Sequence, residues 1–273
     1  LDAVLFEIGR LRELTFRTVG EGSGKSLDLD RFDEYYLHLF AWDAGSQQII
    51  GAYRMGLIDN IIPRYGKRGL YTHSLFDYPT AFIRRIEPAI ELGRSFVRTE
   101  WQRNYTPLLL LWKGIGQYVA HHPQYRVLFG PVSISDEYNS LSIRLMVDYL
   151  RDHNFPKSLA SQVKPRRRLR AAGRMTPRDL ELPRLNMFEG LCDLVSVIED
   201  GRRGVPILLK QYLKMGGKVL GFNVDPQFGD CVDALLMVDL PTTPPRVLAR
   251  YMGKSGADGY LNHQLEPAYR RAA

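Results

Sequence analysis

The sequence holds little cysteine and no long hydrophobic run. Its two cysteines, Cys192 and Cys231, among 273 residues exclude a small disulfide-stapled fold and favour a reducing cytoplasm. The longest apolar runs, such as Leu108 to Trp112, are much shorter than the roughly 18 residues of a membrane span. The length suits one large domain with a sizeable core, and a start on Leu1 rather than methionine fits a piece of a longer protein.

Common catalytic signatures are missing as well. The six histidines form no pair at metal-binding spacing, so we expect no metal site. The serine-hydrolase elbow Gly-x-Ser-x-Gly does not occur. The glycine-rich loop from Gly20 to Lys25 ends in lysine, but it lacks the P-loop spacing and a preceding strand. We interpret it as a flexible lid or connector, with a phosphate cradle as the alternative.

Positive charge is in excess, with 37 Lys and Arg against 30 Asp and Glu and a sequence pI near 9.4. This balance favours an acidic partner. Part of the excess gathers between Lys164 and Arg174, in a proline-interrupted stretch that we interpret as an insertion or flap over 156–184. The stretch suits an acidic carrier protein or an anionic membrane surface, with a solvated loop as the alternative. We expect no nucleic-acid binding, because the arginines lack interleaved aromatic residues.

Hydrophobic patterning predicts an α/β (α+β) fold with a mixed sheet. An amphipathic helix over 1–16 precedes a hairpin formed by 36–42 and 48–57, and strands then alternate with helices. This order favours a mostly antiparallel central sheet with helices on both faces. The further expected strands are 89–98, 125–135, 219–223 and 234–240, and the further helices are 108–121, 140–153, 187–198, 206–215 and 246–251. We expect a loop over 59–69 and little regular structure after the last helix.

Ionisable residues stand inside the apolar strand 89–98. Strand alternation places Glu91 and Ser95 on one face and Arg94 on the other. A carboxylate within a sheet costs free energy unless it is paired or useful, and partial burial would raise its pKa towards that of a general base. Glu91 is therefore either a catalytic base or half of a structural ion pair with Arg94 or Arg54.

The next helix start is a candidate phosphate site. Thr106 is the expected N-cap and Pro107 the first helical residue. Unpaired amides and the helix dipole would attract a phosphate there, close to Arg98 and Arg103. The alternative is an ordinary capped helix with solvated arginines.

Polar residues also end the strand 125–135. Ligands gather beyond the carboxyl ends of strands in open sheets. Ser133 or Tyr138 would donate to a thioester carbonyl or protonate a leaving thiolate. Ser135 would equally serve as a plain helix cap.

Two motifs resemble a known family. Glu-Leu-Gly-Arg-Ser at 91–95 and Phe-Gly-Pro-Val-Ser-Ile-Ser at 129–135, with the order of elements, resemble bacterial GNAT N-acyltransferases of the hemolysin-like and ornithine-lipid synthase group. The resemblance implies a GNAT fold whose sheet is splayed between its central strands, with the donor's pantetheine arm in the splay. It also implies an acyl-carrier-protein thioester as donor and an amino acid amine as acceptor. The implied product is a long-chain N-acyl amino acid, including 3-hydroxy acyl forms, that serves as an aminolipid precursor.

One departure from the family concerns the donor. The usual GNAT pyrophosphate loop, an arginine or glutamine followed by spaced glycines, is replaced by the glycine-free segment 102–107. Such a loop suits the single phosphate of a carrier-bound acyl-phosphopantetheine better than the pyrophosphate of coenzyme A. An acyl carrier protein is the expected donor, and acyl-CoA is the alternative.

The expected site combines these elements. By resemblance Glu91 is the base and Arg94 its motif partner, and Ser133 is the third catalytic candidate. The expected donor-binding residues are Phe96, Val97, Arg98, Arg103, Asn104, Tyr105 and Thr106, with the strand amides near Val97 and Arg98 holding the carbonyl. The expected acceptor-binding residues are Arg54, Ser95, Ser135 and Tyr138.

In domain terms, 1–155 is the GNAT N-terminal half with the donor-binding strand and helix, 185–243 carries the C-terminal helices and hairpin, and 244–273 is a tail. We expect a cytoplasmic N-acyltransferase that associates peripherally with the inner membrane. Two alternatives stay open: an O-acyltransferase acting on lysophospholipid, and a non-catalytic, hemolysin-like membrane-binding protein.

Overall fold

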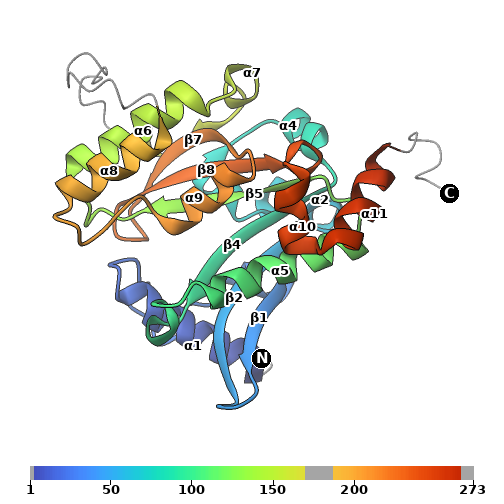
Figure 1. The fold of residues 1–273 in the computed structure, drawn as a ribbon, viewed down its shortest axis with the longest axis horizontal. Coiled ribbons are helices and arrows are strands. Elements are labelled where there is room, and N and C mark those ends of the chain that lie inside the picture. The colour runs from blue at the N-terminus through green and yellow to red at the C-terminus, as the bar shows by residue number, and fades with distance from the viewer. Residues whose placement is uncertain (1–2, 170–186, 266–273) are drawn as a thin grey trace.

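A six-stranded mixed sheet forms the centre of the molecule (Figure 1). The structure is a computed structural model that describes residues 3–169 and 187–265. The strand order is β1-β2-β4-β5-β8-β7, and neighbouring strands are antiparallel except β4 and β5. The expected mostly antiparallel mixed sheet is confirmed. The strands are β1 (Leu37–Asp43), β2 (Gln48–Leu57), β4 (Ala89–Val97), β5 (Val127–Ile134), β7 (Lys218–Asp225) and β8 (Cys231–Asp239), and a separate small sheet pairs β3 (Phe76–Asp77) with β6 (Lys164–Pro165).

Helices cover both faces of this sheet. The largest apolar cluster lies under α5 (Thr106–His121), α6 (Ser140–His153), α8 (Phe188–Ile198), α9 (Ile207–Lys214), α10 (Pro245–Met252) and α11 (Lys254–Leu265). Two smaller clusters lie under α1 (Ala3–Arg17), α2 (Ile58–Tyr65), α3 (Thr72–Leu75), α4 (Thr80–Ile86) and α7 (Lys157–Ala160) on the opposite face. Short 3-10 turns occur at Arg31–Glu34, Lys67–Gly69, Thr99–Trp101 and Leu240–Thr242. Within residues 3–169 and 187–265, no helix is long and apolar enough to cross a membrane.

Two expected irregular segments are helices instead. Residues 59–69 were expected as a loop, but Ile58 and Ile61 are buried and belong to α2, which tolerates Pro63 in its second turn. The segment after α10 forms α11, where a Cβ at Gly256 would lie 3.3 Å from a side-chain carbon of α5. Glycine and proline, which predict loops in a sequence, here allow close helix packing. Of the expected insertion 156–184, the part up to 169 holds α7 and β6, and the rest lies outside the described residues.

The two central strands separate along their length. β4 pairs with β5 only over Ala89–Glu91 opposite Val127–Phe129, and beyond this point β4 continues along β2 while β5 continues along β8. Gly130 stands where the separation begins, and a Cβ there would lie 1.9 Å from the backbone oxygen of Leu92. A glycine is therefore required for the close approach that ends the pairing.

A β-bulge at Arg94 reverses the faces of β4 beyond it. The register against β2 shifts at this point, and Arg94 has a left-handed φ of 48°. Its side chain joins Glu91 on the α1 face, where both contact Tyr71, and Ser95 turns to the α5 face beside Tyr53. The prediction that Glu91 shares its face with Ser95 is wrong, because an extra residue interrupts strict alternation.

Candidate active site

Three adjoining cavities follow the opening between β4 and β5. We call them the outer, central and polar cavities, with volumes of about 540, 210 and 730 Å³. Glu21 and Ser95 line both the outer and the central cavity, and Tyr71 and Arg94 line both the central and the polar cavity. The opening in the sheet therefore connects its α5 face with its α1 face.

Apolar side chains and one loop surround the outer cavity. The lining residues include Tyr53, Phe96, Val97, Gln102, Arg103, Asn104, Tyr105, Leu108, Leu111 and Ile207. Five of the predicted donor-binding residues, Phe96, Val97 and the three from Arg103 to Tyr105, thus lie together at this cavity. It has the apolar walls that a fatty acyl chain requires and a basic residue at its loop.

Two other predicted donor-binding residues do not line the outer cavity. The Arg98 side chain binds Glu100 at 2.6 Å, and its amide donates to the Ile50 carbonyl at 3.0 Å, so this amide is not available to a thioester carbonyl. Thr106 is the first residue of α5 rather than its N-cap, and its amide donates to Asn104 Oδ1 at 2.9 Å. The predicted cap at Thr106 is therefore wrong, because the helix begins one residue earlier than expected.

Two acids line the central cavity: Asp233 on β8 and Glu21 in the loop after α1. Oδ1 of Asp233 accepts hydrogen bonds from Ser133 Oγ at 3.1 Å and from the Cys231 thiol at 3.8 Å. In the part of the chain that the structure describes, Oδ2 of Asp233 has no hydrogen-bond partner, although the residue is only 4% exposed. Buried carboxylate oxygens are normally satisfied, so an oxygen without a partner in a residue that lines a cavity makes Asp233 a candidate for binding a ligand there.

Burial raises the pKa values of both acids to near-neutral pH. Burial and the neighbouring Asp225 raise the pKa of Asp233 to about 7. Burial and Asp233 raise the pKa of the partly exposed Glu21 to about 8. Arg94 opposes both shifts. A carboxyl group that titrates near pH 7 is suited to general-base catalysis.

Arg94 lies where the central and polar cavities meet. Its guanidinium is 3.5 Å from Asp28 and 3.7 Å from Asp30, and it lies 4.9 Å and 4.6 Å from the ring centres of Tyr71 and Phe228. Its Nε makes no hydrogen bond within the described residues. Burial opposes the charge, but Tyr71 and the acids more than offset it, so the pKa of Arg94 is raised. Arg94 is therefore a largely buried cation whose contacts to Asp28 and Asp30 are long for ion pairs.

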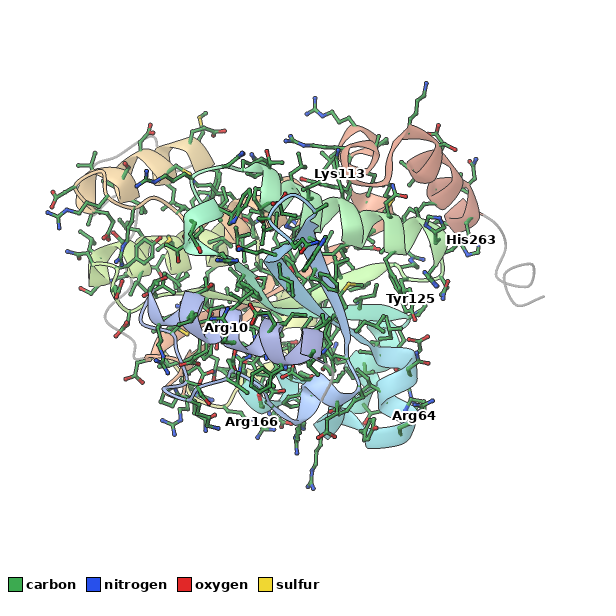
Figure 2. All side chains as sticks on the ribbon, turned by 90° about the horizontal axis from the view of Figure 1, so that it is seen from below. Arg10, Arg64, Lys113, Tyr125, Arg166 and His263 are labelled. Carbon is green, nitrogen blue, oxygen red and sulfur yellow. The ribbon has the colours of Figure 1, made fainter. Side chains whose placement is uncertain are left out.

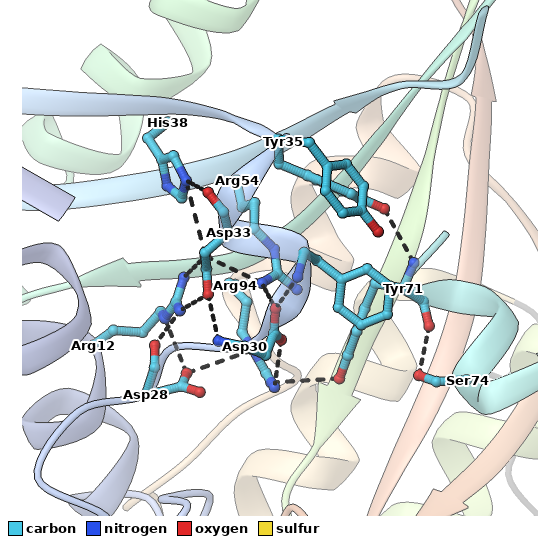
Figure 3. A network of polar contacts seen from close by, with 12 residues as sticks. Arg12, Asp28, Asp30, Asp33, Tyr35, His38, Arg54, Tyr71, Ser74 and Arg94 are labelled. Carbon is cyan, nitrogen blue, oxygen red and sulfur yellow. Dashed lines mark hydrogen bonds and ion pairs between the residues drawn. The ribbon is translucent and has the colours of Figure 1, made fainter. Parts of the chain in front are cut away.

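A network of buried ion pairs fixes the surroundings of Arg94 (Figure 3). Arg12 of α1 binds Asp28 and Asp33, both at 2.9 Å. Arg54 of β2 binds Asp30 at 2.6 Å and Asp33 at 3.2 Å. Arg54 is 1% exposed and lines none of the three cavities, so the structure places this predicted acceptor-binding residue inside the network instead.

Glu91 lies at the closed end of the strand opening. Its carboxylate accepts hydrogen bonds from the amides of Tyr71 and Thr72, at 3.0 and 2.6 Å, and from the Tyr36 hydroxyl. Burial raises its pKa, and these bonds oppose the shift. The alternative expectation, an ion pair with an arginine, is not met among the described residues. Glu91 caps the first turn of α3, is 1% exposed and lines none of the three cavities.

The polar residues near the end of β5 divide into two groups. Ser133 lines the central cavity and hydrogen-bonds to Asp233. Ser135 Oγ donates to the Val19 carbonyl at 3.2 Å, and the Tyr138 hydroxyl donates to the Gly204 carbonyl at 2.7 Å. Ser135 and Tyr138 therefore hold loops together and lie outside the three cavities.

The polar cavity lies on the α1 face of the sheet. Charged residues of both signs line it, including Asp30, Arg166 and Asp225. The basic stretch therefore borders this cavity and not the outer one, as far as it is described, since residues 170 to Arg174 lie outside the described residues. In Figure 2, Arg166 lies below Arg10 of α1 in the same half of the view.

Sequence reasoning missed both acids of the central cavity. Asp233 lies between apolar residues of β8 (Cys231–Asp239), which is the signal that singled out Glu91, but the expected strand began at 234 and did not include Asp233. Glu21 lies in a glycine-rich loop that suggested mobility. In the fold, Glu13 anchors that loop by accepting two of its amide hydrogen bonds, at 3.0 and 2.9 Å.

Comparison with known proteins agrees with this arrangement. Residues 11–113 match the family model described as an acetyltransferase (GNAT) domain. The chain is 33% identical over 258 residues to a glycine N(alpha)-acyltransferase of Phocaeicola vulgatus, covering 86% of this chain and 76% of the relative. It is 34% identical over 176 residues to a glycine N(alpha)-acyltransferase of Bacteroides thetaiotaomicron, covering 59% of this chain and 52% of the relative. No solved structure matches the chain.

These findings confirm the GNAT and N-acyltransferase parts of the resemblance seen in the sequence, whereas the hemolysin-like and ornithine-lipid grouping stays a prediction. The splayed sheet, its cavities and the two relatives agree on one class of enzyme. The chain belongs to the GNAT family, in the group that includes these two N-acyltransferases, and it is an acyltransferase.

Proposed function

We propose that this enzyme transfers a long-chain acyl group from a carrier-bound thioester to the amine of a small amino acid. The observation that carries the proposal is the meeting of the apolar outer cavity with the two acids of the central cavity, through the opening between β4 and β5. Both relatives named above are glycine N(alpha)-acyltransferases, which supports glycine as an acceptor.

The donor is an acyl-phosphopantetheine thioester on an acyl carrier protein, with acyl-CoA as a poorer donor. A pyrophosphate needs several free backbone amides, as at glycine-rich loops. Here the amides of Gln102, Asn104 and Thr106 already donate within the loop region. Arg103 lines the outer cavity and would hold the single phosphate of the carrier arm.

The transfer step uses the groups of the central cavity. An ammonium substrate gives one proton to a carboxylate of the cavity, and the free amine attacks the thioester carbonyl. The new C–N bond forms, the C–S bond breaks, and the thiolate takes a second proton from the nitrogen. The products are an amide, a thiol and one released proton, and the cavity supplies proximity and a base of suitable pKa.

The product is an N-acyl amino acid, a precursor of an aminolipid, made at the cytoplasmic surface of the inner membrane. Phe6 and Leu14 on α1 are exposed, and the end of the same helix lines the outer cavity through Phe16. An acyl chain that leaves this cavity would therefore meet the bilayer beside α1. The basic residues 164–168 would add electrostatic attraction to anionic lipid.

The test is transfer by the purified chain from carrier-bound or CoA-bound palmitoyl thioesters to each amino acid, followed by mass spectrometry and thiol release. We expect an N-acyl amino acid and one thiol per amide. Acylation of a lysophospholipid without any amide would indicate the O-acyltransferase alternative. Vesicle binding without transfer to any acceptor would indicate a non-catalytic membrane protein.

A further inference from the structure

Groups of opposite charge line the central cavity from the two sides of the strand opening. Arg94 comes from β4 and Asp233 from β8. Oδ2 of Asp233 has no hydrogen-bond partner among the described residues, and the Arg94 guanidinium has only long contacts to its neighbours, 3.4 Å to the Tyr71 hydroxyl, 3.5 Å to Asp28 and 3.7 Å to Asp30. Both side chains are largely buried, so the unpartnered oxygen of Asp233 and the long contacts of Arg94 cost stability unless a ligand improves them.

This pair matches the chemistry of an α-amino acid. Such a molecule carries an ammonium and a carboxylate on one carbon atom. A guanidinium binds a carboxylate by charge-assisted hydrogen bonds, and the ammonium must lose a proton to a carboxylate before it becomes a nucleophile. The two charges of the ligand therefore meet their complements in one small cavity.

We propose that the central cavity is the acceptor subsite for an α-amino acid, in which Arg94 binds the carboxylate and Asp233 receives the proton of the amine. The inference rests on the proposed function. It assigns the base to a residue outside the Glu-Leu-Gly-Arg-Ser motif, and it gives Arg94 a role in selecting the acceptor. The polar cavity, which Arg94 also lines, is the route by which the amino acid enters.

The charged groups around Asp233 come from several elements. Asp225 on β7 and Glu21 in the loop after α1 are acids, Cys231 is a neighbour on the same strand, and Arg94 is the cation of this set. A ligand carboxylate at Arg94 would reduce the stabilising effect of that cation on the Asp233 carboxylate. The substrate thereby strengthens the base as it binds.

The acceptor role of Arg94 is tested with glycine and glycinamide, which differ in the carboxylate. We expect wild-type enzyme to prefer glycine in kcat/KM. In Arg94→Gln the glycine value should fall about 10- to 100-fold more than the glycinamide value, and Arg94→Lys should recover part of the preference. Thermal unfolding of each variant shows whether it is folded. Equal losses for both acceptors in a folded variant would overturn the assignment.

The base is tested by Asp233→Asn with Glu91→Gln as the matched control. Asp233→Asn should lower kcat at least about 100-fold with both acceptors and leave the glycine KM nearly unchanged. Glu91→Gln should keep kcat within about threefold. A kcat that survives Asp233→Asn overturns the inference, and a wild-type enzyme that acylates no amine from either donor overturns the proposed function instead.

Discussion

Two buried carboxylates occupy opposite ends of one junction in the sheet, and their surroundings differ. Glu91 lies where β4 and β5 still pair and accepts hydrogen bonds from two amides and a phenol. Asp233 lies where the strands have separated and keeps one oxygen without a partner among the described residues. Burial raises the pKa of both. A raised pKa therefore does not distinguish the two acids as candidate bases, whereas the unpartnered oxygen of Asp233 and its place beside a cavity do distinguish them.

The two halves of β4 differ in the same way: one supports the fold and the other faces the cavities. Its first half holds α3 in place through Glu91. In its second half, the bulge at Arg94 directs the Arg94 and Ser95 side chains to opposite faces of the sheet at the opening. A strand of this length can serve both purposes because the bulge changes its alternation between them.

The pH profile is expected to give the largest contrast between the two acids. If Asp233 is the base, kcat/KM should rise about tenfold per pH unit up to about pH 7, because the carboxyl is protonated below its pKa. Asp233→Asn should move this break to the pKa of the amine itself. Glu91→Gln should leave the break in the pH profile near pH 7. A shift of the break in Glu91→Gln would indicate that Glu91, and not Asp233, is the base.

The end of the opening where β4 and β5 still pair is expected to tolerate added side-chain volume less well than the separated end. Gly130→Ala would place a Cβ 1.9 Å from the Leu92 carbonyl oxygen, so the strands must shift, and we expect a loss of about 3 kcal/mol in unfolding free energy. Gly93→Ala is the control, because its nearest neighbour would be 3.9 Å away. Chemical denaturation measures both, and equal losses would show that the close approach at Gly130 is not what limits the substitution.

The two acids should also have opposite effects on stability. The folded pKa of Asp233 is about 7 against 3.8 for the ordinary group, so its contribution is fully present below pH 3.8 and is lost as the pH rises through 7. Asp233→Asn should therefore stabilise the fold above pH 7 by about 1–3 kcal/mol. Glu91→Gln should cost about 1–3 kcal/mol, because an amide group cannot accept all three hydrogen bonds. Melting curves at pH 4 and pH 8 test both signs.

Most of the fold and about half of the candidate site could be predicted from the sequence. Apolar patterning located the hairpin, β4 and α6, since β2 and β4 contain runs of buried residues and α6 buries one face. It could not show the bulge at Arg94, because a bulge depends on the partner strand. It also could not show that Asp233 of β8 and Glu21 of the first loop come together, since that contact depends on strand order. Glu91 was identified correctly as a buried acid, but its partners come from α3, which has no strong sequence pattern.

The smallest expected effect concerns which end of the opening receives the donor. Arg103 lines the outer cavity, whereas Arg168 belongs to the basic stretch beside the polar cavity and lines neither. If the carrier protein docks at the outer cavity, Arg103→Glu should raise the KM for the carrier-bound donor about three- to tenfold at low salt. The effect should shrink at high salt, because exposed charges are screened. Arg168→Glu should change this KM less than about twofold. A larger effect of Arg168→Glu would mean that the donor enters through the polar cavity. The acceptor would then have to enter through the outer cavity. The apolar walls of that cavity suit a zwitterion poorly.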